Sequence, residues 1–322
     1  MLSEFKLIAD YFTRPLRNAG HLALGVGDDC ALLTPAPGMQ MAVSTDMLVE
    51  GRHFFAGAEP HALGHKCLAV NLSDLAAMGA KPLAFTLALA LPEADPEWLA
   101  PFSQGMLALA DLHGCELIGG DTTKGPLTIC ITVFGEVPLE KALRRDRAQA
   151  GDDIWVSGNL GDARLALAGY RSELHLNEAE QSEAGARMHT PSPRVALGLQ
   201  LRGIANAAID ISDGLRGDLQ HILDASHVGA TLKIDTLPVG HVLKNQNKDL
   251  QRRFALAGGD DYELCFTAAA DLRDAVFGAA RIAGVAVSRI GSIDTQAGMR
   301  LIDAAQHTVV IDATSFDHFQ SP

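Results

Sequence analysis

The sequence lacks the marks of several common protein classes. Its five cysteines form no CxxC pair and its twelve histidines show no ligand spacing, which disfavours a zinc site. The best apolar run, near residues 83–91, is too short to cross a bilayer, and the N-terminus has neither the basic start nor the cleavage site of a secretory signal. We therefore expect a cytoplasmic protein with no membrane partner. We expect its cysteines to be reduced and buried; they are Cys30, Cys67, Cys115, Cys130 and Cys265.

A surplus of positive charge is also missing. The formal net charge is −13, whereas nucleic-acid-binding proteins attract the phosphate backbone with clustered Lys and Arg. This argues against nucleic acid as a partner. It does not argue against an anionic substrate, because divalent cations held by carboxylates reverse the local sign of a site. With 322 residues, 48% of them hydrophobic, the chain is long enough for two domains.

Strands and helices mix along the whole chain. Bulky and small residues alternate over 83–91 and predict a strand there. Further strands are expected at 127–137, 154–157, up to Ile211 and at 262–267, and helices over 61–78, 96–112, from about 193 and over 213–225. A charged, turn-rich stretch at 138–153 separates the two halves. We therefore predict an N-terminal domain over 1–138 and a C-terminal domain over 139–322.

Aspartates recur beside Gly, Ser or Thr in five separated places. These are GVGDD at 25–29, STD at 44–46, NLSD at 71–74, GGDTT at 119–123 and DISDG at 210–214. Any one of them alone is typical of a turn or a helix N-cap. Five of them, each at the end of an apolar segment, favour a shared site, because sites are built on loops at the ends of core elements.

Carboxylates that converge need a positive partner. Two of them about 4 Å apart repel by about 4 kcal/mol at an effective dielectric near 20. A hard cation such as Mg²⁺ fits, because it prefers oxygen ligands and binds substrate phosphates through a few carboxylates. The glycines of GGDTT allow main-chain N–H groups to approach an anion. A Walker A sequence is absent and the GVG at 25–27 lacks the third glycine of a dinucleotide motif, so we expect an ATP site of another design.

Six segments, in order and over nearly the whole chain, carry a resemblance to a known family. They are GVGDDCALL, AVSTDMLVEGRHF, KCLAVNLSDLAAMGAKP, LIGGDTTKGPL, AIDISDGL and GGDDYELCF. NLSDLAAMGA and GGDTT resemble the aminoimidazole ribonucleotide synthetase-like superfamily, and STDMLVEGRHF with the SFDHF ending resembles bacterial thiamine-monophosphate kinase within it. The resemblance implies two α+β domains. The first would bind ATP and Mg²⁺ and form a homodimer through its sheet, and the second would complete the active site.

The resemblance also implies the ligands of Mg²⁺ and ATP. The metal ligands fall on Asp29, Ser44, Thr45, Asp46, Asp74, Asp121, Asp210 and Asp213. The ATP contacts fall on Gly120, Asp121, Arg145 and Ser212. Arg144 and Arg147 are alternatives to Arg145, and a solvated linker charge is the other interpretation. In this assignment Asp46, Asp121 and Arg145 are the catalytic residues.

The substrate contacts implied by the resemblance fall on His53, Asp260 and Phe316. His53 has an alternative role as a structural histidine, and Phe316 either stacks on a planar ring or packs the tail. Asp260 stands where the family motif GGED has a Glu. The carboxylate that faces the substrate is therefore shorter by one methylene, and either a water or a closer loop would fill the gap.

The implied reaction is phosphorylation of thiamine monophosphate by ATP, with in-line transfer of the γ-phosphoryl group to give thiamine diphosphate. Two relatives in the superfamily, selenophosphate synthetase and the hydrogenase-maturation carbamoyl dehydratase, need a reactive Cys or selenocysteine near the N-terminus or a Cys at the C-terminus. The segment before Cys30 has no Cys, and the sequence ends in Gln320-Ser321-Pro322, so neither relative is expected. A non-enzymatic cation-binding protein would explain the aspartates but not GGDTT or His53, and EF-hand spacing is absent.

Overall fold

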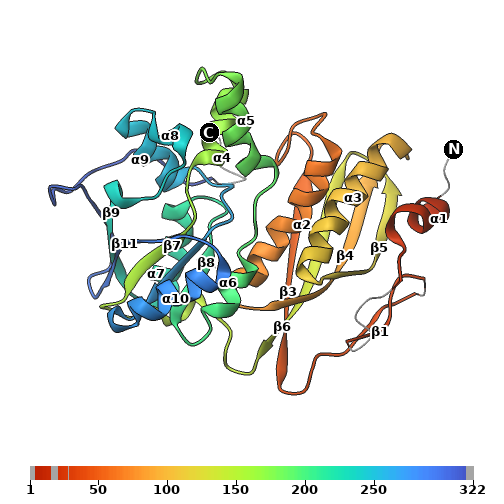
Figure 1. Ribbon diagram of the computed structural model, residues 1–322, viewed down its shortest axis with the longest axis horizontal. Helices are drawn as coiled ribbons and strands as arrows, with labels where there is room; N and C mark the ends of the chain where they lie inside the picture. Colours follow the sequence, from red (N-terminus) through yellow and green to blue (C-terminus); the bar gives the residue numbers. More distant parts are fainter. Residues whose placement is uncertain (1–3, 16–20, 28, 317–322) are drawn as a thin grey trace. The chain divides into compact units, whose positions relative to one another are not determined.

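The computed structural model describes residues 4–15, 21–27 and 29–316. Asp28 of the GVGDD segment and residues 317–322, which include the end of SFDHF, lie outside the described residues. The chain divides into two compact units (Figure 1). Unit 1 consists of residues 1–75 and 80–140, and unit 2 of residues 76–79 and 141–322.

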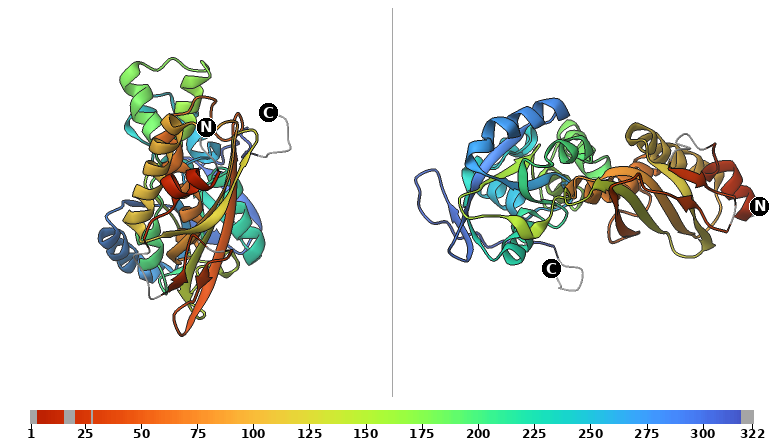
Figure 2. Two further views of the ribbon diagram at one scale, coloured as in Figure 1. Left: turned by 90° about the vertical axis from the view of Figure 1, so that its right-hand side faces the viewer. Right: turned by 90° about the horizontal axis from the view of Figure 1, so that it is seen from below.

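Unit 1 is built on a four-stranded sheet with helices on one face. The strand order is β3-β6-β4-β5, antiparallel except for the β4–β5 pair. The strands are β3 (Met39–Val49), β4 (Lys81–Leu91), β5 (Glu116–Lys124) and β6 (Thr128–Pro138). Helices α2 (Pro60–Ala77) and α3 (Pro96–His113) lie in front of the sheet in Figure 1 and on one side of it in Figure 2. A short segment with α1 (Glu4–Leu7), η1 (Ile8–Phe12), β1 (Leu22–Leu24) and β2 (Leu32–Leu33) precedes β3.

The size of alternate side chains explains why the helices cover only one face. Leu87 of β4 and Ile131 of β6 are buried on the covered face, whereas their neighbours Ala88 and Cys130 lie on the other. Large apolar residues gain most from a helix packed over them, at roughly 25 cal/mol per Å² buried. The uncovered face is solvent-accessible in this unit, and Met47 of β3 is 56% exposed there.

Two glycines bring α2 and α3 into close contact. A Cβ at Gly64 would lie 2.0 Å from the carbonyl oxygen of Phe102, and one at Gly105 would lie 2.0 Å from the carbonyl oxygen of His61. No larger residue fits either position, so the helix pair packs with its backbones touching. This packing holds α2, which carries the NLSD segment, against α3.

Unit 2 is built on a six-stranded sheet with helices on both faces. The strand order is β12-β9-β11-β7-β10-β8, with a parallel β12–β9 pair at one edge. The strands are β7 (Asp153–Ser157), β8 (Ala205–Asp210), β9 (Gly229–Lys233), β10 (Leu264–Ala268), β11 (Val287–Asp294) and β12 (Gly298–Ile302). Ile154 shares a core with Leu219 of α7 (Leu215–Ser226). The next residue, Trp155, contacts Phe277 of α10 (Arg273–Ala283) with ring centroids 5.3 Å apart.

Further helices complete unit 2. They are α4 (Asp162–Tyr170), α5 (Glu178–His189), α6 (Val195–Gln200), α8 (His241–Lys244) and α9 (Lys248–Ala257), with short 3₁₀ turns η2 (Arg145–Arg147), η3 (Ile234–Thr236) and η4 (Ala270–Leu272). In the described part of the chain no helix is both long enough and apolar enough to span a bilayer.

The cysteines agree with expectation only in part. All five are free thiols, and Cys67, Cys115 and Cys265 are buried. Burial raises the pKa of each of these three thiols, because it disfavours the thiolate. The prediction of burial is wrong for Cys30, which is exposed, and for Cys130, which is half-buried. Cys130 alternates with buried Ile129 and Ile131 along β6 and so lies on the uncovered face.

Candidate active site

Ser44, Asp46 and Asp74 meet between β3 and α2, although they are up to thirty residues apart in sequence. The hydroxyl of Ser44 donates to Oδ2 of Asp74. The N–H of Asp46 donates to Oδ1 of Asn71 at 3.1 Å, and Asn71, which is fully buried, donates in turn to the carbonyl of Cys67 at 2.9 Å. Asn71 therefore fixes β3 against the helix, and the carboxylates of Asp46 and Asp74 lie near each other.

This pair has the electrostatics expected of a cation site. Burial, and then the charge of Asp74, raises the pKa of Asp46 to about 6. Burial and the charge of Asp74 both disfavour the ionised form of Asp46. A hard cation between the oxygens would instead favour that form and lower the pKa. The oxygen donors of Ser44, Asp46 and Asp74 fit Mg²⁺, which takes such ligands.

Thr45 and His53 flank this cluster differently. The hydroxyl of Thr45 bonds the hydroxyl of Thr132 at 2.8 Å on the uncovered face, so its side chain points away from Ser44 and Asp46. His53 lies in the turn after β3, and its Nδ1 accepts the N–H of Val49 at 2.9 Å. Because that N–H must donate, Nδ1 carries no proton and the ring presents a donor at Nε2.

Asp29, Gly120 and Asp121 line a cavity of about 560 Å³ inside unit 1. Apolar side chains from η1, including Phe12, form another part of its wall. Gly120 has φ +151°, and a Cβ there would lie 1.8 Å from the carbonyl oxygen of Leu87. Glycine is therefore required at this position so that β5 can pair closely with β4 where both border the cavity.

The expectation that the aspartates of the acidic segments lie where the backbone leaves an ordered element is wrong for STD and GGDTT, because Asp46 lies inside β3 and Asp121 inside β5. It is wrong for NLSD too, although the helix predicted over 61–78 already contains Asp74, which lies inside α2. Glycine and aspartate disfavour strands locally, but pairing with neighbouring strands overrides that preference. β5 is one of the two edge strands of the sheet. Outward main-chain groups near Asp121 therefore come from a strand edge rather than from a loop.

The two sites of unit 1 are separate within one chain. The strand register aligns Asp46 with Ile131, Leu87 and Gly120 across the sheet. Three strand spacings separate Asp46 from Gly120, roughly 14 Å. Asp121 follows Gly120 and is therefore also far from Asp46. Because Mg²⁺ binds oxygen at about 2.1 Å, Asp46 and Asp121 do not ligate one ion together in a single chain.

Unit 2 brings together two loops that carry predicted residues. The first follows Asp210 at the end of β8, and the second, residues 258–263, precedes β10. The N–H of Asp260 donates to the carbonyl of Ser212 at 2.7 Å, and the N–H of Tyr262 to that of Ile211 at 2.8 Å. Ser212, predicted to contact ATP, thus lies directly beside Asp260, predicted to contact the substrate.

The C-terminal segment reaches the first of these loops. The N–H of Phe316 donates to the carbonyl of Asp213 at 3.1 Å, and the hydroxyl of Ser315 accepts the N–H of Gly217 at 2.8 Å. Phe316 itself is 49% exposed. Its ring is therefore held next to the loop by the backbone without being packed into the core.

Asp218 is a residue of this site that the sequence analysis missed. Its Oδ2 accepts the N–H groups of Ser212, Asp213 and Gly214 at 3.0, 3.1 and 3.1 Å. Burial, and then the charge of Asp213, raises the pKa of Asp218 to about 7. An acidic residue in the first turn of α7 is a known signal for a side chain that reaches back to cap the helix, and that signal would have found it.

Arg145 lies at the opposite end of α7 from Ser212. Its carbonyl accepts the hydroxyl of Ser226, the last residue of this twelve-residue helix, and such a helix is about 18 Å long. The side chain of Arg145 is exposed. The alternative Arg144 pairs with Asp146, partly through Nε at 2.9 Å.

Within residues 4–15, 21–27 and 29–316, no three His, Cys, Asp or Glu side chains gather in a preformed metal cluster. The predicted ligands instead fall into three places: Ser44 with Asp46 and Asp74, Asp29 with Asp121, and the loop after Asp210. Mg²⁺ commonly binds through one or two carboxylates and completes its shell with water and phosphate oxygens. The pairs seen here suit that mode of binding.

The two mixed sheets, each with its own helices, define a two-domain α+β protein of the AIR synthase-related class. Residues 27–137 match the family described as "AIR synthase related protein, N-terminal domain", and residues 149–304 match its C-terminal domain. Within that class the chain belongs to the thiamine-monophosphate kinase family of enzymes. The implied fold class is thereby confirmed as far as the two α+β domains.

Similar proteins place the chain in this family along nearly its whole length. It is 43% identical over 322 residues to the thiamine-monophosphate kinase of Salmonella typhimurium, covering 99% of each chain. The crystal structure of the thiamine-monophosphate kinase from Stenotrophomonas maltophilia K279a superposes with a TM-score of 0.83 at 49% identity, covering 88% of this chain and 91% of that one. A structure of AaThiL complexed with AMPPCP and TMP gives a TM-score of 0.76 at 28% identity, covering 96% and 100%.

Proposed function

We propose that this chain transfers the γ-phosphoryl group of ATP to thiamine monophosphate and so makes thiamine diphosphate. The observation that carries the proposal is the pairing of two loops in unit 2, where Asp260 donates its N–H to the carbonyl of Ser212 at 2.7 Å. This puts a candidate nucleotide residue beside a candidate substrate residue, as a direct transfer requires. The related AaThiL structure, with AMPPCP and TMP, supports the same pair of ligands.

The reaction needs no strong general base. The phosphate of thiamine monophosphate is largely ionised at neutral pH, so its oxygen attacks the γ-phosphorus without a strong general base. The protein has to align the two phosphates and offset their charge. We assign the holding of one Mg²⁺ to Asp46 with Asp74, and the holding of further Mg²⁺ ions to Asp29 with Asp121 and to Asp210 with Asp213. When bound, the cation would neutralise charge on the transferring group.

Other residues bind the two substrates in this proposal. The cavity beside Gly120 and Asp121 receives ATP, since its polar side carries carboxylates for the cation and its apolar side includes Phe12. Arg145, exposed on η2, is assigned an ATP contact away from Ser212, because its backbone lies at the opposite end of α7. His53 offers a donor at Nε2 to thiamine monophosphate, and Phe316 offers a ring face for stacking.

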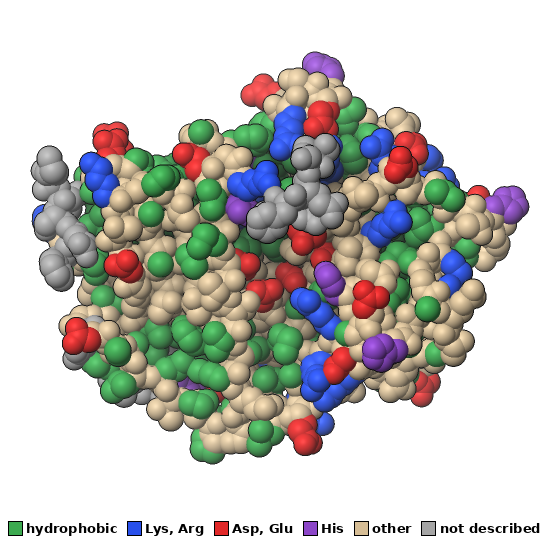
Figure 3. Space-filling view, turned by 180° about the vertical axis from the view of Figure 1, so that it is seen from behind, with side chains coloured by type: hydrophobic (Ala, Val, Ile, Leu, Met, Phe, Trp, Pro, Cys, Tyr) green, Lys and Arg blue, Asp and Glu red, His purple; other side chains and the backbone are tan. Residues whose placement is uncertain are grey.

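We also propose that the chain forms a homodimer through the uncovered face of the unit 1 sheet. Met47 and Val43 of β3 are 56% and 58% exposed on it, and Figure 3 shows hydrophobic side chains gathered over this part of the molecule, seen from behind. Such a patch favours association. A second copy packed sheet to sheet by two-fold symmetry would cover it.

One assay tests the activity directly. Purified protein is incubated with Mg·ATP and thiamine monophosphate, and the products are separated by chromatography, with free thiamine as the control acceptor. We expect thiamine diphosphate and ADP in equal amounts, and no product from free thiamine. Cation binding in calorimetry without ATP binding would favour the non-enzymatic alternative instead.

A further inference from the structure

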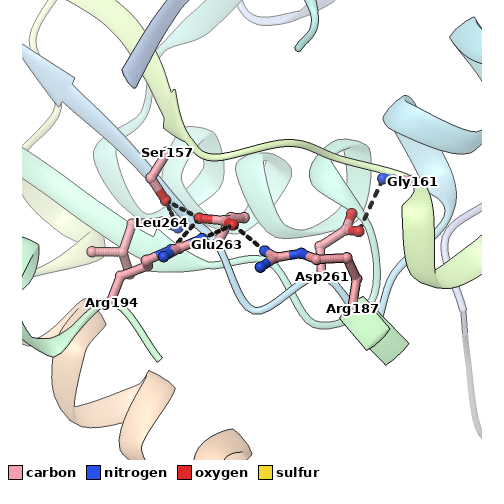
Figure 4. Close-up of polar contacts among 7 residues, drawn as sticks. All are labelled: Ser157, Gly161, Arg187, Arg194, Asp261, Glu263 and Leu264. Carbon is pink, nitrogen blue, oxygen red and sulfur yellow. Dashed lines mark hydrogen bonds and ion pairs between the residues drawn. The ribbon is translucent and has the colours of Figure 1, made fainter. Parts of the chain in front are cut away.

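A buried ion-pair network anchors the loop that carries Asp260, and Figure 4 shows the Glu263 carboxylate between Arg187 and Arg194. Glu263, at the end of this loop, is 0% exposed. Its carboxylate accepts hydrogen bonds from Arg187 at 2.5 Å, from Nε of Arg194 at 2.6 Å and from the hydroxyl of Ser157 at 2.5 Å. A buried carboxylate with two guanidinium partners and a hydroxyl has little freedom to move. One end of the loop is therefore fixed.

Asp261 fixes the middle of the loop. Its Oδ1 accepts the N–H of Gly161 at 2.9 Å. Gly161 has φ +84°, and a Cβ there would lie 2.7 Å from the carbonyl carbon of Phe254, so only glycine fits where this donor packs against Phe254. The hydrogen bond from Gly161 therefore sets the position of the Asp261 side chain (Figure 4).

The second carboxylate oxygen of Asp261 lowers the stability of the folded protein. Oδ2 is buried and has no hydrogen-bond partner among the described residues, and burial raises the pKa of Asp261 well above its ordinary value. A buried carboxyl oxygen without a partner opposes folding. Such a residue is explained better by a task at the site than by stability alone.

The backbone on either side of Asp261 adopts an uncommon conformation. Asp260 has φ +62° and Tyr262 has φ +51°, in the left-handed region that residues other than glycine seldom occupy. Both N–H groups are used by the neighbouring loop, at the carbonyls of Ser212 and Ile211. The geometry of Asp260 thus depends on contacts from both sides of the loop.

We propose that Asp261 and Glu263 are positioning residues for substrate recognition: they hold Asp260 in its left-handed conformation beside Ser212 and so set where its carboxylate meets the substrate. This inference rests on the proposed function, in which Asp260 contacts thiamine monophosphate. Asp261 and Glu263 act only through Asp260. Their shared effect is on the affinity for thiamine monophosphate, with a smaller effect on ATP.

The test compares the KM values for both substrates in Asp260→Ala, Asp261→Ala and the double variant. We expect Asp261→Ala to raise the KM for thiamine monophosphate roughly tenfold, because small misplacements of a contact group have large effects. The KM for ATP should change much less. If Asp261 acts through Asp260, the double variant is no worse than Asp260→Ala alone. If the role of Asp261 were purely structural, the KM of the double variant would rise by the product of the two single increases. That result would overturn the proposal.

Two further variants keep the test decisive if Asp261→Ala fails to fold. Asp261→Asn retains an acceptor for the N–H of Gly161, so its KM should return close to that of the wild type. Glu263→Gln puts an amide donor against an arginine and should raise the same KM through the other anchor. An unchanged KM for thiamine monophosphate in Glu263→Gln and Asp261→Ala contradicts the inference.

The matched control is Asp153→Asn. Asp153 is a buried carboxylate at the far end of β7 from Ser157 and pairs with Arg273 and Arg289. Its loss should lower the melting temperature and leave the KM values unchanged. Suppose that Asp260→Ala still makes thiamine diphosphate with an unchanged KM for thiamine monophosphate. In that case Asp260 does not contact the substrate, and the inference is wrong. If no thiamine diphosphate is made at all, the proposed function has failed.

Discussion

Three aspartates of this protein share a raised pKa. Asp46, Asp162 and Asp218 all have a pKa raised chiefly by burial. Each is therefore held in the fold at some expense of stability. Asp46 and Asp218 belong to the candidate active site, and Asp162 lies near the Asp261 network.

Asp162→Asn should change how stability depends on pH. Burial raises the pKa of Asp162 from 3.8 to about 6. The folded state therefore binds this proton more tightly than the unfolded state, so the associated stability is present below pH 4 and lost as pH rises through 6. Between pH 4.5 and 7.5 the wild type should lose roughly 2 kcal/mol relative to the Asn variant. Urea unfolding in EDTA across that range measures the difference.

Asp153→Asn serves as the control for this pH effect. Burial raises the pKa of Asp153, but Arg273 and Arg289 outweigh it and hold the pKa below its ordinary value. Its stabilising charge is lost only as pH falls below that ordinary value. Over pH 4.5–7.5 this variant should differ from the wild type by a nearly constant offset, and an equal slope in both variants would contradict the assignment to Asp162.

Asp46→Asn should abolish most activity without unfolding the protein. The amide keeps the shape of the side chain but removes the charge that would hold Mg²⁺, so we expect kcat to fall at least about 100-fold. Unfolding free energy should not decrease, since burial and Asp74 already oppose that charge. Glu136→Gln, a buried carboxylate at Lys81 on the same sheet, should remain active. Near-normal turnover by Asp46→Asn would argue against a metal role.

At the scale of elements, β5 combines a structural and a functional requirement. GGDTT resembles a loop in the sequence, yet it lies within the edge strand β5, and its residues 119–122 line the cavity. Its two glycines differ sharply in their surroundings. A Cβ at Gly120 would meet the carbonyl oxygen of Leu87 at 1.8 Å, whereas one at Gly119 would meet only Cγ2 of Thr86 at 4.0 Å.

Gly120→Ala and Gly119→Ala should therefore behave differently. We expect Gly120→Ala to separate β5 from β4 and to lower the free energy of unfolding by about 2–4 kcal/mol. Gly119→Ala should change it by less than about 1 kcal/mol. Urea unfolding of the two variants side by side measures the contrast. Equal destabilisation would mean that β5 does not pair with β4 in this register.

At the scale of the whole molecule, the proposed dimer makes a prediction about mass. Met47→Arg places a charge in the uncovered face of the unit 1 sheet and should shift the protein from dimer to monomer in analytical ultracentrifugation. Leu112→Arg, on α3, changes a residue that is 76% exposed and should leave the mass unaltered. A wild type that sediments as a monomer at micromolar concentration would refute the proposed interface.

The sequence predicts those helices and strands that depend on local patterns, and misses those that depend on pairing with distant strands. The strand at 83–91 and the helices at 61–78 and 96–112 are confirmed as β4, α2 and α3 with small shifts at their ends, because their periodicity reports which face is buried. β3 and β5 contain polar and glycine residues that hide the pattern, and only pairing with β6 and β4 makes them strands.

Local motifs and periodicity are enough to identify the family, the α+β class and the acidic segments that carry candidate ligands. Three contacts emerge only from the folded chain: Asp74 accepts a hydrogen bond from Ser44, Asp218 holds the loop after Asp210, and Glu263 anchors the loop of Asp260. The contacts of Asp74 and Glu263 join residues far apart in the chain. The contact of Asp218 depends on the orientation of the first turn of α7 relative to the loop before it. All three contacts are set by how sheets and helices pack, which no local pattern specifies.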